Sequence, residues 1–150
     1  MRHKQKIFKC GEPSPITERI YPREQVEAAI EEYFKPIGSK YGEMDGDGQA
    51  INLDRISHKI IDSYVDEEDW WWAEIETMDE LPMGNILRQL LEAGLNMRIA
   101  PRGTGYVSDK MIVEGFAIIA LDVAASSEQP SSRITDEDLI QTIIKMGEKQ

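Results

Sequence analysis

The chain has 150 residues, the length of one domain with its own hydrophobic core, and 17 basic against 28 acidic residues give it a net charge of −11. That charge argues against binding to nucleic-acid backbones and against docking on anionic membranes. The single cysteine, Cys10, cannot form an intrachain disulfide, and this favours a reducing compartment. One cysteine and two histidines also predict no metal site. Because the chain lacks a long apolar run, no transmembrane helix or signal peptide is expected.

The first part of the chain predicts one strand, one helix and two loops. A short strand is expected over residues 7–10 and a Pro- and Gly-containing loop over residues 11–20. Residues 21–34 predict a helix, because Pro22 suits its first turn and apolar residues recur on one face. Residues 40–53 are rich in Gly and Asp and are expected to form a loop.

The middle of the chain predicts a hairpin followed by a helix. Residues 56–64 and 70–78 are β-prone and flank an acidic turn, which indicates two paired strands. Residues 81–94 show helical spacing of apolar side chains and end at Gly94, a typical helix stop.

The last part predicts two further strands and a helix. Residues 97–109 are expected to form a short strand that breaks into an Arg-Gly-Thr-Gly turn, and residues 110–124 a long strand bulged near Gly115. Thr135 is expected to cap a last helix. The order of elements favours an α+β fold with an antiparallel, barrel-like sheet flanked by helices. One domain is expected over residues 1–132, followed by a C-terminal helix and tail over residues 133–150.

Two conspicuous motifs have simple structural explanations. The Asp45–Gln49 stretch is not an EF-hand loop, because the sixth and twelfth positions counted from Asp45 hold Ala50 and Ile56 instead of Gly and Glu. The Trp70–Trp72 run could form a stacking platform for bases or sugars. Alternate tryptophans of a strand face opposite sides, so core and edge packing is favoured.

Two further features invite a catalytic interpretation. His58 lies in an apolar strand, where a hydrogen-bonded structural role is the usual one. The Arg102–Gly105 segment does not open a helix and lacks the Gly-Lys-Ser/Thr ending of a nucleotide loop, so phosphate binding is disfavoured. An oxyanion site remains possible, because it needs only a fixed backbone amide and a nearby cation.

Several segments occur in the order seen in one enzyme family. They read RIYP, GEMDGD, NLDRISH, PMGNILRQLLEAG, APRGTG and FAIIALDV, and they fall between residues 17 and 132. With these motifs the chain resembles the prohead core proteases of large contractile-tailed phages, whose fold is similar to that of herpesvirus assembly proteases. The resemblance implies serine protease chemistry, acyl transfer to water through an acyl-enzyme, with no cofactor or metal.

The chain departs from this family at both reactive positions. The resemblance assigns the nucleophile position to Ala100, whose methyl group cannot attack a carbonyl, and the usual histidine position to Gly46, which cannot accept a proton. His58 is then the candidate base. The resemblance also implies Asp122 as the candidate acid, and Arg102 with Gly103 as the oxyanion support.

Two histories are compatible with these departures. The chain is either a natural pseudoprotease kept for binding or assembly, or an active enzyme whose serine was replaced by alanine. A displaced nucleophile, Ser57 or Ser108, is a weaker alternative. The resemblance implies phage scaffold (core) and capsid proteins as substrates or partners, a possible homo-oligomer, and a place in the prohead or virion, assembled in the host cytoplasm. The competing interpretation is a non-enzymatic structural or assembly protein of the virion, or an acidic binding domain.

Overall fold

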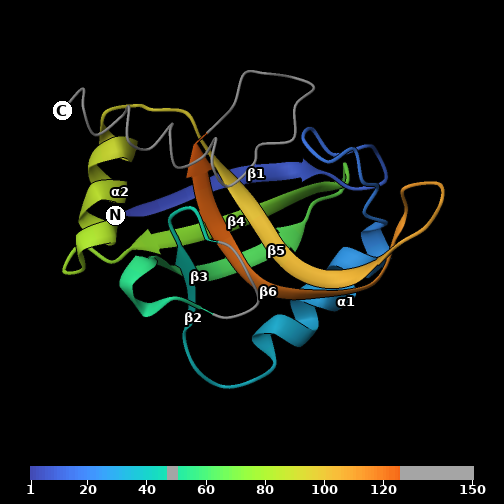
Figure 1. The fold of residues 1–150 in the computed structure, drawn as a ribbon, viewed down its shortest axis with the longest axis horizontal. Helices are drawn as coiled ribbons and strands as arrows, with labels where there is room; N and C mark the ends of the chain where they lie inside the picture. Colours follow the sequence, from blue (N-terminus) through green and yellow to red (C-terminus); the bar gives the residue numbers. More distant parts are fainter. Residues whose placement is uncertain (47–50, 126–150) are drawn as a thin grey trace.

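A computed structural model describes residues 1–46 and 51–125. The described residues form two α-helices, one short 3-10 helix and six strands, in an α+β arrangement (Figure 1). In chain order the elements are β1 (Arg2–Lys9), α1 (Arg23–Phe34), β2 (Lys40–Glu43), η1 (Leu53–Arg55), β3 (Ile56–Val65), β4 (Trp70–Thr77), α2 (Pro82–Glu92), β5 (Met97–Val107) and β6 (Val113–Ala125).

Four strands form an antiparallel sheet in the order β1-β4-β3-β2. Its centre is the predicted β3–β4 hairpin, which the structure confirms. The Asp66 carboxylate organises the turn by accepting hydrogen bonds from the amides of Glu68 and Trp70, each at 2.9 Å. Along β4, buried and half-buried side chains alternate, so one face of this sheet belongs to the core and the other faces outward.

The remaining two strands, β5 and β6, form a long antiparallel ribbon that crosses the four-stranded sheet (Figure 1). Its register shifts between Arg102 and Gly103 and again between Thr104 and Tyr106. Gly115 adopts a φ of 60°, which confirms the bulge expected there. The Arg-Gly-Thr-Gly segment is therefore part of a continuous bulged strand, and the prediction that the chain turns at this point was wrong.

The last residue of β2 and the two residues after it join the ribbon to the four-stranded sheet. The amide of Glu43 donates to Oδ1 of Asp122 (3.0 Å), and the amide of Asp45 donates to the carbonyl of Val123 (2.8 Å). Between them, the amide of Met44 donates back to the carbonyl of Arg55, next to β3. The first and third of these amides thus bind β6, and the second binds Arg55 at the start of β3.

The two predicted helices are present and cover different parts of the sheets. Helix α1 lies against β6 and β3, and its buried residues Val26 and Ala29 belong to the apolar face expected from the sequence. Helix α2 lies against β3 and β4, starts at a proline and ends before Gly94, whose φ is 77°. Within the described residues, neither helix is long and apolar enough to cross a membrane.

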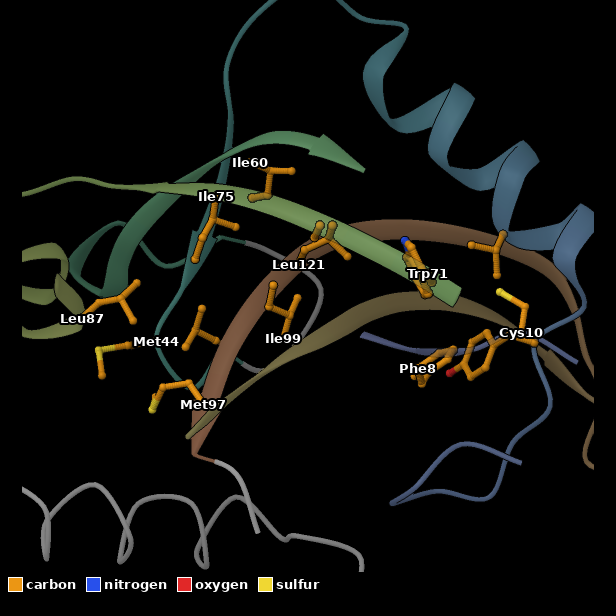
Figure 2. Close-up of a cluster of buried hydrophobic side chains, with 14 of the residues drawn as sticks. Phe8, Cys10, Met44, Ile60, Trp71, Ile75, Leu87, Met97, Ile99 and Leu121 are labelled. Atoms are coloured by element: carbon orange, nitrogen blue, oxygen red, sulfur yellow. The ribbon is translucent and has the colours of Figure 1, made fainter. Parts of the chain in front are cut away.

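The core fills the space between the ribbon and the four-stranded sheet. Figure 2 shows Ile99 and Leu121 of the ribbon near Ile60 and Ile75 of the sheet. At one end Trp71, fully buried, makes edge contacts with Phe8 and Phe116, at ring-centroid distances of 5.3 and 6.1 Å. This confirms the core position expected for one of the three tryptophans.

Three expectations need correction or fall outside the described residues. The sheet is not closed into a barrel: among the described residues β5 and β6 pair with each other, and their hairpin otherwise makes only two isolated bridges, Met44 with Val123 and Ile20 with Ile112. Residues 40–43 form strand β2 instead of a loop, because β3 supplies hydrogen-bonding partners for them. The helix expected from Thr135, and the boundary at residue 132, lie outside the described residues.

Candidate functional site

An open cavity of about 660 Å³ lies where the bulged part of β5 meets β6. Five of the residues that sequence reasoning assigned to a site line it: Gly46, Ala100, Arg102, Gly103 and Asp122. Ala100 and Asp122 lie directly opposite each other in the β5–β6 ladder, so their side chains share one face of the ribbon. The structure therefore brings together residues that are up to 76 positions apart in the chain, since residue 46 and residue 122 meet here.

Gly46 lies directly against the carboxylate of Asp122. A Cβ atom placed on Gly46 would lie 2.7 Å from Oδ2 and 2.8 Å from Oδ1 of that side chain. Real Cβ atoms do not approach other heavy atoms so closely, because the van der Waals radii overlap. The position therefore accommodates glycine with the carboxylate as it stands, and a side chain there would require the carboxylate to move.

The carboxylate of Asp122 belongs to a buried ionic cluster that also contains Glu43 and Arg102. Nη2 of Arg102 lies 2.6 Å from Oε2 of Glu43, and Nε of Arg102 lies 2.9 Å from Oδ2 of Asp122. Both carboxylates are nearly inaccessible to solvent, with relative exposures of 1% for Glu43 and 2% for Asp122. One guanidinium thus forms ion pairs with two buried carboxylates.

Burial raises the pKa of Asp122 to about 6 and outweighs the opposing effects of the Glu43 amide and the Arg102 guanidinium. This carboxyl group titrates closer to neutral pH than an exposed aspartate does. Beside Gly46 it forms the acidic wall of the cavity.

His58 occupies a different environment. It is fully buried, and both ring nitrogens are engaged: Nδ1 lies 2.7 Å from the Ser57 hydroxyl and Nε2 lies 2.7 Å from the carbonyl oxygen of Leu121. Because a carbonyl only accepts, Nε2 carries the proton and Nδ1 accepts from Ser57. Burial lowers the pKa of His58 to about 4, so the ring is neutral.

The space for this ring is provided by Gly42. A Cβ atom on Gly42 would collide with the His58 ring and with the carbonyl oxygen of Leu121. His58 is therefore held between β2 and β6 and is not among the residues that line the cavity. The carbonyl that His58 binds belongs to Leu121, the residue before Asp122 in β6, so the ring lies near the site but is bonded to the backbone.

The two serines considered as displaced nucleophiles also have local partners. The Ser57 hydroxyl is buried with His58. The Ser108 hydroxyl accepts hydrogen bonds from the amides of Lys110 and Ile112 in the β5–β6 turn. Among the described residues that line the cavity, the hydroxyl groups come from Tyr21 and Thr104.

Sequence reasoning missed three residues of this site. Glu43 was part of a quoted motif but received no role, although it shares Arg102 with Asp122. Arg19 and Tyr21 line the cavity and come from the loop before α1. In the sequence, Arg19 and Tyr21 belong to the RIYP segment. That segment contributed to the family resemblance, but neither residue was given a role in the site.

The cavity lining offers charged and aromatic groups. It combines a guanidinium from Arg19, aromatic surface from Tyr21 and Phe116, and the carboxyl group of Asp122. Among residues 1–46 and 51–125, no three His, Cys, Asp or Glu side chains are grouped so that they could hold a metal ion.

The comparisons with known proteins agree with the sequence motifs at the level of the fold. No protein-family model matches the chain, and no curated protein sequence matches it. Among solved structures, the bacteriophage T4 capsid assembly protease gp21 matches with a TM-score of 0.74 and 20% sequence identity, over 84% of this chain and 82% of that one. The resemblance read from the sequence is thereby confirmed for the architecture: this chain has a prohead-protease-like fold.

Proposed function

We propose that the chain is a phage prohead protease homologue that binds scaffold and capsid proteins during head assembly without cleaving them. The fold supports a relationship to a capsid assembly protease. The cavity supports binding, because it is large enough to hold several side chains of a polypeptide and carries both cationic and aromatic groups.

The contact between Gly46 and Asp122 carries the proposal that the chain is inactive. A serine protease needs a base within hydrogen-bond reach of its nucleophile. The chain contains only two histidines, and neither serves this cavity: His58 is bonded on both nitrogens, and His3 pairs with Gln5 on β1. The Asp122 carboxylate fills the space into which a side chain at position 46 would project.

The alternative is an active enzyme whose serine was replaced by alanine. It requires only one change at position 100, but the enzyme would then have to use His58 as its base. That histidine would have to give up its bonds to Leu121 and Ser57 and turn towards the cavity. The energetic cost of leaving such buried groups without partners disfavours this alternative.

The decisive experiment is the Ala100→Ser variant. Its reaction with a fluorophosphonate probe and its self-cleavage during expression are followed by intact mass spectrometry, with circular dichroism as the check that it folds. We expect neither probe labelling nor cleavage. Labelling of the serine or cleavage products would contradict the proposal, and loss of that reactivity in Ala100→Ser/His58→Gln would then identify His58 as the base.

Binding is tested separately. The chain is co-expressed with the scaffold and capsid proteins of its own phage, and its incorporation into sedimenting head particles is quantified. Thr104→Trp, which places a bulky ring at an exposed position of the cavity wall, is expected to reduce incorporation, whereas Lys110→Trp in the β5–β6 turn is the matched control. Particles that form normally but exclude the wild-type chain would refute an assembly role.

A further inference from the structure

The buried ionic cluster in the wall of the cavity holds more acid than base. Among the described residues it contains two carboxylates, Glu43 and Asp122, and one guanidinium, Arg102, with side-chain exposures of 1%, 3% and 10%. The guanidinium lies 2.6 Å from Oε2 of Glu43 and 2.9 Å from Oδ2 of Asp122, so its charge is divided between two acids. Incompletely compensated buried charge is unfavourable, and a carboxyl group in such a place relieves it by binding a proton.

Asp122 is the acid that takes up this proton. Glu43 has the shorter contact with the guanidinium, whereas burial raises the pKa of Asp122 to about 6 and the negative charge of Glu43 adds to the rise. Oδ1 of Asp122 accepts from the Glu43 amide. Oδ2 accepts no hydrogen bond within the described residues and is the oxygen nearest to Gly46 of the cavity wall, which makes it the site for the proton.

Two titratable groups that face Asp122 from other elements do not supply the missing cation. On α1, burial and the negative charge of Asp122 raise the pKa of the Tyr33 phenol, which is therefore neutral. On β3, the His58 ring is also neutral and donates to the carbonyl of Leu121.

The other charged groups near the cluster act mainly on one another or on solvent. Oδ2 of Asp45 lies 3.5 Å from Nη2 of Arg55, and the charge of Asp45 also acts on Arg98 of β5. Arg19 lines the cavity at a half-exposed position, where solvent screens its charge. The charges that act on Asp122 are thus chiefly those of its two partners in the cluster.

We propose that the cluster of Glu43, Arg102 and Asp122 is a proton-operated switch for the wall of the cavity. With a proton on Asp122 the cluster is balanced, one guanidinium to one carboxylate, and the wall stays in the closed arrangement described above. Without the proton, the excess negative charge favours an open arrangement in which water hydrates the carboxylate. Gly46 is the cavity residue in direct contact with Oδ2, so water enters on this side.

The size of the response follows from the linkage between protonation and opening. In the open arrangement the carboxyl group has its ordinary pKa of 3.8, whereas in the closed arrangement its pKa is about 6. The closed wall therefore binds the proton more tightly, and the open population rises with pH between these two values and levels off above them. Between pH 5 and pH 7 the ratio of open to closed molecules is expected to rise about tenfold.

The switch regulates the same cavity in which the proposed function places a partner polypeptide, and its effect on binding rests on that function. A closed, ordered wall loses less conformational freedom when a partner binds, so binding is favoured below pH 6. The two experiments that follow need no partner. Failure of the switch therefore leaves the binding proposal intact, and failure of binding leaves the switch intact.

The titration is measured by carbon NMR at the side-chain carboxyl group of Asp122, with the exposed Asp54 as a reference in the same spectra. A midpoint near pH 6 is expected in the wild type. Glu43→Gln removes one of the two acids and is expected to move this midpoint to lower pH. Glu31→Gln, at an exposed position of α1, is the matched control and is expected to leave it unchanged. A midpoint that coincides with that of Asp54, or one that Glu43→Gln does not move, would overturn the proposal.

The opening is measured at the methyl group of Ala100, which lies directly opposite Asp122 in the β5–β6 ladder. Methyl relaxation dispersion detects exchange between two arrangements on the microsecond to millisecond timescale. Relative to Asp122→Asn, which carries no charge at either pH, the open population of the wild type should rise about tenfold from pH 5 to pH 7. The methyl group of Ala73, buried in β4, is the internal control, and effects of His58 cancel in the comparison. A ratio that does not change with pH would overturn the proposal; if Asp122→Asn does not fold, the titrations of wild type and Glu43→Gln decide it.

Discussion

His58 makes the stability of this fold dependent on pH in a way that can be measured. The ring is fully buried and neutral, and burial lowers its pKa from the ordinary 6.5 to about 4. In the unfolded chain the same histidine takes up a proton as the pH falls below 6.5, whereas in the folded chain it does so only near pH 4. The unfolded state binds more protons across this window, so acidification lowers the stability.

The size of the effect follows from the shift. A difference of about 2.5 pKa units corresponds to about 3 kcal/mol once the pH is below both values, at about 1.36 kcal/mol per unit. Between pH 7.5 and pH 5 the expected loss is about 2 kcal/mol. Asp122 has the opposite sign, because its raised pKa makes the folded state take up a proton first as the pH falls through about 6. The wild-type curve alone therefore underestimates the effect of His58.

The assay compares wild type with His58→Gln by urea unfolding at both pH values. The wild type should lose about 2 kcal/mol relative to the variant on going from pH 7.5 to pH 5, because groups common to both proteins cancel. His3→Gln controls for the loss of a histidine at a site outside the core. If the wild type keeps its advantage over His58→Gln unchanged at pH 5, the reasoning from burial is refuted.

Three further predictions concern the site and the core. Gly46→Ala should destabilise the fold by about 1–3 kcal/mol, because its Cβ would lie 2.7 Å from the Asp122 carboxylate, and the cost should largely disappear in an Asp122→Ala background. Arg102→Met leaves two buried carboxylates without their cation and should cost about 3–5 kcal/mol at pH 8 and less at pH 5, where Asp122 binds a proton. Trp71→Ala should cost about 3–5 kcal/mol, because the ring is fully buried against Phe8 and Phe116. Urea midpoints measure all three.

Each of these predictions has an outcome that contradicts it. An equal cost of Gly46→Ala with and without the Asp122 carboxylate would show that the crowding lies elsewhere. A pH-independent cost of Arg102→Met would show that the charge of Asp122 is not what the guanidinium compensates. Unfolding of Trp71→Ala at the wild-type midpoint would show that the aromatic end of the core contributes little.

Elements with strong local signals were predicted well from the sequence. The two helices and the β3–β4 hairpin have apolar periodicity, a proline or glycine at a boundary, or an Asp-rich turn, and these signals come from neighbouring residues. Strand β1 was underestimated, since its outward side is formed by Arg2, Lys4 and Lys6, and its extended shape depends on pairing with β4. Long-range pairing, in this case with β3, also explains why residues 40–43 form a strand instead of a loop.

The sequence predicted several residues of the site, but it did not predict the contacts between them. Sequence motifs named Ala100, Gly46 and Asp122 together, and the three line one cavity. What lay beyond the sequence were the pairings across the fold: the sharing of Arg102 by two acids, and the hydrogen bonds that hold His58. The contact between Lys6 of β1 and Trp70 of β4, with Nζ 4.4 Å from the ring centroid, was missed for the same reason, because the two residues are more than 60 positions apart in the chain.

The alternating amides of Glu43, Met44 and Asp45 have a consequence for exchange with solvent. The Glu43 and Asp45 amides can exchange their hydrogens for deuterium only when the segment separates from β6, whereas the Met44 amide needs release from Arg55. Equal exchange rates at the three amides would mean that ribbon and sheet open in one cooperative event. Faster exchange at Glu43 and Asp45 would mean that β6 detaches first, and the exchange pattern of three consecutive residues thus reports how the two halves of the fold come apart.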